Sequence, residues 1–339
     1  MIEVEGLVKR YTVYKRVAGT LRRRREEVSA LDGLSFSVPR GSVTGFIGPN
    51  GAGKSTTVKI LSGILWPDGG SCLVGGRVPW KERKAHVKRL GVVFGQRSQL
   101  WWDLPVSDSL ALLGDMYGVP RARRDATIAL LVAELELGSF LETPVRQLSL
   151  GQRMRCELAA ALVHEPELLF LDEPTIGLDA PSKLALRGFV RRLNAERGLT
   201  VILTTHDMDD IDALADRVLL IGKGRALFDG TMAGLRREAG SRKRLVVDLV
   251  EPLRDGSDSR STGGEGRSGA PSAAGAEAPA GLELVARSPM RLEFSFDPAR
   301  IEAAKAIAYV ASAYRAADLS IEGQPAEELI AALYKRHGV

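Results

Sequence analysis

The stretch Gly48-Pro49-Asn50-Gly51-Ala52-Gly53-Lys54-Ser55-Thr56 decides the fold of this chain, because it fits the phosphate-binding pattern G-x-x-x-x-G-K-[ST]. It follows an apolar, strand-like run, 43–47, and precedes a run of helical spacing without a breaker, 57–61. Glycines let backbone N–H groups close around phosphates, and the helix directs its positive dipole end at the same anion. The pattern therefore predicts a strand, a nucleotide-binding loop and a helix, with Lys54 reaching the β- and γ-phosphates and Ser55 holding Mg²⁺.

The size and composition of the chain limit its class. Its 339 residues fit two domains, and an apolar fraction of 45% is ordinary for a globular protein. The net charge of +5 does not argue for nucleic acid by itself and is equally compatible with weak attraction to an anionic membrane surface. The two cysteines, Cys72 and Cys156, lack metal-ligand spacing, which favours a reduced, cytoplasmic protein.

The hydropathy pattern contains no apolar run of the ~18 to 20 residues that a membrane helix needs. Residues 1–8 alternate between polar and apolar like a strand, without the basic region and apolar core of a signal peptide. We therefore expect a cytosolic protein that would act at a membrane only through a partner.

Residues 1–235 alternate between strand and helix patterns, which predicts one α/β domain. Four strand candidates stand out, and the last three are largely continuous apolar runs, as expected for parallel strands buried on both faces. They are 90–94, 168–171, 200–204 and 217–221. The pattern from 107 to 141 is helical and lacks strand signals, so we expect a helical subdomain at about 100–165 within this domain.

Residues 236–339 predict a small C-terminal α+β module. Its strand candidates are 245–250, 282–286, 291–296 and 319–321, and its helix candidates are 298–314 and 326–334. At about 254–281 the composition collapses to Gly, Ser, Ala, Pro and charged residues. Such a segment cannot bury enough apolar surface to offset its ordering entropy, so we expect a disordered insert there.

A second set of motifs adds chemistry to the nucleotide-binding loop. The strand candidate 168–171 ends in Asp172, whose position suits Mg²⁺ coordination, and Glu173, which is placed to polarise an attacking water. The other motifs are Leu-Ser-Leu-Gly-Gln at 148–152, Gly-Leu-Asp at 177–179, Thr-Thr-His-Asp at 204–207, and Gln96 after the strand that ends at Phe94.

In this order the motifs resemble those of ABC-type ATPases, the nucleotide-binding subunits of ABC transporters. The resemblance covers about residues 1–235 and implies a P-loop NTPase core that binds ATP and Mg²⁺ and hydrolyses ATP. It makes Gly48, Pro49, Asn50, Gly51, Ala52, Gly53, Lys54, Ser55 and Thr56 the Walker A loop, with Tyr11 stacked on adenine. It makes Glu173, the switch histidine His206 and the Q-loop glutamine Gln96 catalytic, and Ser55, Gln96 and Asp172 the Mg²⁺ ligands. Ser149, Gly151 and Gln152 of the signature motif would face the nucleotide of a second subunit, and Asp179 lies in the D-loop.

Three of these residues also fit plain structural roles. His206 could be a histidine satisfied within the core, and Gln96 could be a solvated loop residue. Tyr11 could be an ordinary strand aromatic, and Tyr14 competes with it for the adenine site.

The sequence departs from the family pattern in two places. The third signature position, usually glycine, is Leu150; leucine suits a helix start better, and we expect the γ-phosphate contact of Ser149 and Gly151 to survive. Residues 15–27 form an insert with six basic side chains. It suits either a solvated charged hairpin or short helix, or contact with anionic lipid or an acidic membrane partner. The pair Trp101-Trp102 suits either the groove that receives the membrane subunit or the core of the helical subdomain.

The resemblance predicts the ATP-hydrolysing subunit of a bacterial ABC transporter, an exporter more than an importer. One cassette per chain predicts a homodimer, or a pair with another cassette, at the inner face of the cell membrane on a polytopic permease; no nucleic acid is expected. The alternative is a soluble ABC-type ATPase acting on nucleic acid or ribosomes, but such proteins usually carry two cassettes or a long coiled coil, and neither is visible here. A P-loop kinase or GTPase is disfavoured by the signature motif and His206.

Overall fold

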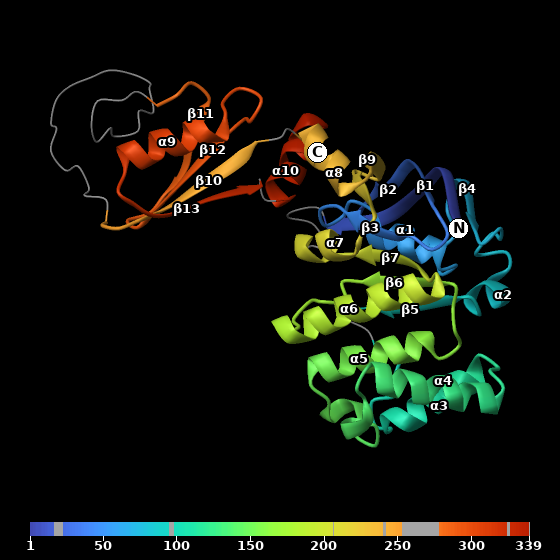
Figure 1. Cartoon of the computed structure of the whole chain (residues 1–339). Coiled ribbons are helices and arrows are strands. Elements are labelled where there is room, and N and C mark those ends of the chain that lie inside the picture. The colour runs from blue at the N-terminus through green and yellow to red at the C-terminus, as the bar shows by residue number, and fades with distance from the viewer. Residues whose placement is uncertain are drawn as a thin grey trace. The chain divides into compact units, whose positions relative to one another are not determined.

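The computed structural model describes residues 1–16, 23–94, 98–205, 207–239, 242–252, 278–323 and 326–338. It divides the chain into two compact units, Met1–Met232 with His337–Val339, and Ala233–Arg336 (Figure 1). Of the predicted insert at about 254–281, positions 254–277 lie outside the described residues.

The first unit is built on a six-stranded sheet of order β5-β6-β7-β3-β8-β9. Its strands are β5 (Leu90–Phe94), β6 (Leu168–Asp172), β7 (Thr200–Thr204), β3 (Val43–Ile47), β8 (Arg217–Gly222) and β9 (Arg225–Gly230). Pairing is parallel throughout except for β9, which runs antiparallel to β8. Residues of β3 and β7 are buried along their whole length, as the apolar runs predict for strands covered on both faces.

A second, antiparallel sheet of order β2-β1-β4 belongs to the same unit. Its strands are β1 (Ile2–Arg16), β2 (Arg23–Val38) and β4 (Gly69–Val74). The hairpin of β1 and β2 continues in register to Arg16 opposite Arg23, so the described ends of the basic insert are strands. Residues 17–22, between these strands, are outside the described part of the chain.

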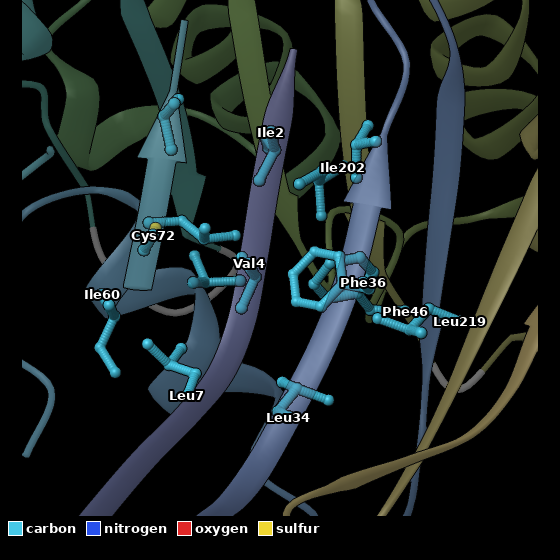
Figure 2. Packing of buried hydrophobic residues seen from close by; sticks show 14 of the residues in the cluster. Ile2, Val4, Leu7, Leu34, Phe36, Phe46, Ile60, Cys72, Ile202 and Leu219 are labelled. Carbon is cyan, nitrogen blue, oxygen red and sulfur yellow. The ribbon is translucent and has the colours of Figure 1, made fainter. Parts of the chain in front are cut away.

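The core of the first unit lies where the two sheets face each other, as Figure 2 shows. Ile2 and Val4 of β1 point into it, and the ring of Phe36 on β2 meets the ring of Phe46 on β3 edge-on, with centroids 5.3 Å apart. An edge-to-face aromatic pair adds about 0.5–1.5 kcal/mol to the burial of the rings. Ile60, on the helix that follows the glycine loop 48–53, joins the same core, which packs that helix against β3.

The described helices of the first unit range from 5 to 18 residues. They are α1 (Lys54–Leu61), α2 (Arg83–Val87), α3 (Val106–Met116), α4 (Arg121–Glu134), α5 (Leu150–Leu162), α6 (Ala180–Arg197) and α7 (Met208–Leu214), with 3-10 turns at Gly138–Phe140 and Val145–Gln147. Helices α3, α4 and α5 pack on one another, and α5 also packs on β5. These three helices lie within the range predicted for the helical subdomain.

The second unit contains a four-stranded antiparallel sheet of order β11-β12-β10-β13. Its elements are β10 (Lys243–Leu249), β11 (Leu282–Arg287), β12 (Arg291–Phe296), α9 (Ala303–Ala313) and β13 (Ala316–Gly323), with α8 (Met232–Ala239) before them and α10 (Ala326–Arg336) after them. Strands β12 and β13 flank β10 and are joined through α9, which is a split β-α-β unit. The apolar faces of β10, β12 and α9 form its core.

One predicted boundary in this unit is wrong. The sequence spacing suggested a helix from 298, but α9 begins at Ala303. The cause is Asp297, whose carboxylate accepts the N–H of Ala299 and whose carbonyl accepts the N–H groups of Arg300 and Ile301. These bonds form a separate turn that uses residues 297–301 before the helix starts.

Among the described helices, none combines the length and the hydropathy that crossing a membrane requires.

The histidine at the end of α5 provides a test of this packing through pH. The ring of His164 stacks on Tyr117 with centroids 3.8 Å apart, and its Nε2 donates to the carbonyl of Leu90 at 3.0 Å. Its Nδ1 is buried with no hydrogen-bond partner among the described residues. Burial lowers the pKa of His164 to about 4.

We expect His164 to weaken the fold as the pH falls. The folded pKa is below the ordinary value, so the unfolded chain binds more protons between about pH 6.5 and pH 4, and stability is lost on acidification through that window. When the pH is lowered from 7 to 5, the free energy of unfolding should therefore fall by about 1–2 kcal/mol less in His164→Gln than in wild type. Urea unfolding at the two pH values measures this difference. His337→Gln, a change at an exposed histidine, is the control. Equal losses in wild type and His164→Gln would contradict the prediction.

Candidate functional site

The loop between β3 and α1 has a shape that only glycine permits. A Cβ on Gly48 would lie 2.6 Å from the carbonyl oxygen of Ile221, and one on Gly53 would lie 2.6 Å from that of Ala30. Gly51 and Gly53 also have positive φ angles, +83° and +110°. Pro49 and Asn50 form the exposed tip of the loop. The backbone can therefore approach a ligand closely at this turn.

The first turn of α1 is open to an anion. Among the described residues no side chain caps the helix, and its first turn contains no acid. The N–H groups of the first turn of a helix have no partner within the helix, and they carry the positive end of the helix dipole. Ser55 is exposed in this turn, Thr56 is half-buried beside it, and Ala52 is buried below. The turn thus leaves N–H groups available to an anion, with an exposed hydroxyl on Ser55.

Lys54, the first residue of α1, is buried and its ammonium is held by the loop itself. Its Nζ donates to the carbonyls of Gly48 and Pro49, the latter at 3.1 Å. Burial lowers the pKa of Lys54, and the nearby carboxylates of Glu173 and Asp172 oppose that shift. Lysine and both acids are therefore close enough to interact.

The acids reach this position because β6, β7 and β3 are parallel neighbours, so their carboxyl ends meet at one edge of the sheet. The hydroxyl of Thr204, at the end of β7, donates to Oδ1 of Asp172. The backbone N–H of Glu173 donates to the carbonyl of Thr204 at 2.8 Å. Glu173 has a φ of 54°, a left-handed conformation that a non-glycine residue adopts at a cost of about 1–3 kcal/mol and that often marks a functional site.

The predicted signature residues form the beginning of α5. Ser149 is the N-cap: its Oγ accepts the N–H of Gln152 at 3.2 Å, and the Gln152 side chain accepts the N–H of Ser149 at 2.9 Å. Leu150 is the first helical residue. The Cδ2 atom of Leu150 lies 2.8 Å from the position that a Cβ on Gly177 would take. Leu150 therefore packs on Gly177, two residues before the predicted D-loop residue Asp179.

Asp179 and Gly151 lie close to the same serine of α6. The Asp179 carboxylate accepts the N–H of Ser182 at 3.1 Å and caps α6, and bonds to Ser182 lower the pKa of Asp179. A Cβ on Gly151 would lie 2.8 Å from the Ser182 hydroxyl. Asp179 therefore has a local structural role in addition to any role toward a second subunit.

The structure does not bring every predicted residue to the loop. Gln96 and His206 lie outside the described residues. Tyr11 is on β1 opposite Val28, with the ammonium of Lys9 5.9 Å from its ring centroid. Figure 1 draws β6 and β7 between α1, which follows the glycine loop, and α5, which begins with the predicted signature residues.

Sequence reasoning missed a polar cluster beside Glu173. Asp210, on α7, is fully buried and accepts hydrogen bonds from the hydroxyls of Thr175 and Thr205 and from the guanidinium of Arg187. A hollow of about 190 Å³ adjoins the cluster; its lining includes Glu173, Thr175, Thr205 and Asp207. One signal was available, because Asp210 lies four residues before the buried Leu214 and so falls on the inward face of its helix.

Comparison with known proteins gives consistent matches. The family model described as ABC transporter matches residues 31–176. The daunorubicin/doxorubicin resistance ATP-binding protein of Streptomyces peucetius is 39% identical over 240 residues, which cover 71% of this chain and 68% of that protein. The Nod factor export ATP-binding protein I of Ralstonia nicotianae is 39% identical over 211 residues, 62% of this chain and 65% of that protein.

Among solved structures, one described as the ATP binding subunit of an ABC transporter superposes with a TM-score of 0.59 at 26% identity. The match covers 70% of this chain and 92% of that one.

The N-cap of α5 can be tested separately from any catalytic role. Ser149→Ala leaves the N–H of Gln152 without its acceptor, and we expect it to lower the free energy of unfolding by about 1 kcal/mol in urea titrations. Ser149→Asn, which keeps a capping oxygen, should unfold at the wild-type urea concentration. If both variants behave like wild type, the capping box does not stabilise α5.

Proposed function

The chain is an ABC-type ATPase, a member of the ATP-binding subunits of ABC transporters, and on that premise we propose that it couples ATP hydrolysis to export through a separate membrane permease. The proposal rests mainly on one observation: the glycine loop, Lys54 and the Asp172–Glu173 pair lie at the same edge of the sheet. The relatives in drug resistance and Nod factor export support export as the direction.

The loop and the first turn of α1 would bind the phosphates of ATP. Backbone N–H groups of the loop and of the first turn of α1 would surround the β- and γ-phosphates, and the ammonium of Lys54 would move from the loop carbonyls to phosphate oxygens. Tyr11 would stack on the adenine, as the family resemblance implies.

The donors near this turn fit Mg²⁺. The exposed Ser55 hydroxyl and the half-buried Asp172 carboxylate are the hard oxygen ligands that Mg²⁺ prefers, and Thr204 orients the carboxylate. Gln96 would complete this set. The metal would supply charge neutralisation at the phosphates.

Glu173 would polarise the water that attacks the γ-phosphate. Its left-handed backbone is bonded to Thr204, which fixes the start of its side chain beside Asp172. His206 would contact the γ-phosphate from the end of β7.

Two chains would form two composite sites. Ser149, Gly151 and Gln152 would complete a site in another cassette, as the family resemblance implies, with Asp179 near them. A two-fold homodimer satisfies both sites at once, and a pair with a different cassette would do the same. The hydroxyl of Ser149 can donate its proton to a phosphate while it accepts from Gln152.

The permease would dock near Trp101 and Trp102 at the inner face of the cell membrane. Their side chains are 39% and 53% exposed, so neither is a core residue of the helical subdomain. Exposed neighbouring tryptophans are typical of surfaces that bind a partner. We expect no role for nucleic acid.

The Glu173→Gln variant tests the assignment of the catalytic base. It should bind ATP like wild type, lose at least about 100-fold in kcat, and accumulate an ATP-bound dimer, because the phosphate contacts remain while water activation is lost. Glu167→Gln makes the same change just before β6, at the other end of the strand, and should keep wild-type turnover. Steady-state kinetics and size-exclusion chromatography with ATP measure both effects. Wild-type turnover in Glu173→Gln would remove Glu173 from this role.

Mixing two defective chains tests the composite site. Lys54→Ala should weaken nucleotide binding, and Gly151→Asp should block the surface offered to the other chain. Each dimer of one with the other has one doubly damaged site and one intact site, so mixtures should regain ATPase activity that neither variant shows alone if the sites act independently. A Gly151→Asp chain that hydrolyses ATP normally by itself would reject the composite site.

A further inference from the structure

We propose that Asp210 is a positioning residue that couples helix α6, which begins after Asp179, to the segments that follow β6 and β7 beside the nucleotide. The inference rests on the proposed ATPase site, because the segment after β6 begins with Glu173. It assigns a role to a residue outside the predicted nucleotide motifs.

The carboxylate of Asp210 connects three parts of the chain. Its Oδ2 accepts the hydroxyls of Thr175 and, at 3.2 Å, Thr205. Its Oδ1 accepts Nε of Arg187 on α6 at 2.6 Å. The side chain is completely buried, so water cannot replace any of these donors. Removing one donor from a buried carboxylate is costly, which makes the three positions depend on one another.

Two of the three donors lie close in sequence to the residues proposed to act on the nucleotide. Thr175 is two positions after Glu173, and Thr205 directly follows the last residue of β7. Both threonines are outside helices and strands, and the acceptor that they share links their two segments directly. The same two segments, with Glu173 and Asp207, line the hollow of about 190 Å³.

A second ion pair connects α6 with the segment after β7. Nζ of Lys183 lies 2.5 Å from Asp207, and the guanidinium of Arg187 lies 3.5 Å from the same carboxylate. Lys183 and Arg187 are one turn apart on α6, so both cations face α7. A shift of α6 would therefore move Asp207 and Asp210 together.

This arrangement explains how contact between two chains could change the position of Glu173, the residue proposed to polarise the attacking water. Asp179 caps α6 near the surface offered to a second cassette, and α6 contacts α7. Movement of the start of α6 on dimer closure would pass through Arg187 to Asp210 and from there to Thr175. The backbone that carries Glu173 would then take its active position only in the closed dimer.

Substitutions at Thr175 give the sharpest test. Thr175→Val keeps the shape but removes the hydroxyl, and kcat for ATP should fall about tenfold while KM stays within about twofold of wild type, because the phosphate contacts are untouched. Thr175→Ser restores the hydroxyl and should restore kcat. Asp229→Asn, which removes a carboxylate from the Arg217 ion pair between β8 and β9, is the control.

Hydrogen exchange without nucleotide provides an independent arm. In Asp210→Asn, peptides containing Glu173 and Asp207 should exchange at least about tenfold faster than in wild type, whereas Asp229→Asn should leave them unchanged. The N–H of Asp207 is informative because it donates to the Thr205 hydroxyl at 3.0 Å.

The outcomes separate this inference from the proposed function. If wild type and Asp229→Asn hydrolyse ATP but Thr175→Val does so equally fast, or changes KM alone, Asp210 does not position the catalytic segment. Unchanged exchange in Asp210→Asn also overturns the inference. If wild type itself hydrolyses no ATP, the proposed function fails, and the exchange result decides whether Asp210 couples these segments.

Discussion

The parallel pairing of β7 with β3 on one side and β6 on the other is the constraint on which the site depends. It brings the end of β3, where the glycine loop begins, to the same edge as Asp172. Thr204 makes the connection local, since its hydroxyl holds Asp172 and its carbonyl holds the N–H of Glu173. Strand β7, which has no predicted catalytic side chain of its own, therefore determines the spacing between Lys54 and the two acids.

The elements closest to the nucleotide were the easiest to predict from sequence. The loop, α1 and strands β5 to β8 follow from local signals, namely glycine spacing and continuous apolar runs, and the structure confirms them. The start of α9 was missed because Asp297 binds its own neighbours, a competition that periodicity alone does not show.

The cluster around Asp210 could not be predicted in the same way. Its donors come from 175, 187 and 205, and only the pairing of β6 with β7 and the packing of α6 on α7 bring them together. A buried aspartate in a helix is visible as a position on an apolar face, but its partners are not. The packing of Leu150 on Gly177 is a contact of the same kind, between two motifs that are distant in sequence.

The loop carbonyls that hold Lys54 have a consequence for ligand choice. Because the ammonium is already bonded to Gly48 and Pro49, nucleotide binding exchanges one set of acceptors for another and does not satisfy an unpaired charge. Only a ligand that brings phosphate oxygens as far as Nζ compensates for the carbonyl bonds that it breaks. With the proposed phosphate contact, a nucleoside monophosphate would bring no oxygen to Nζ, so the resting loop would favour ligands with a longer phosphate chain.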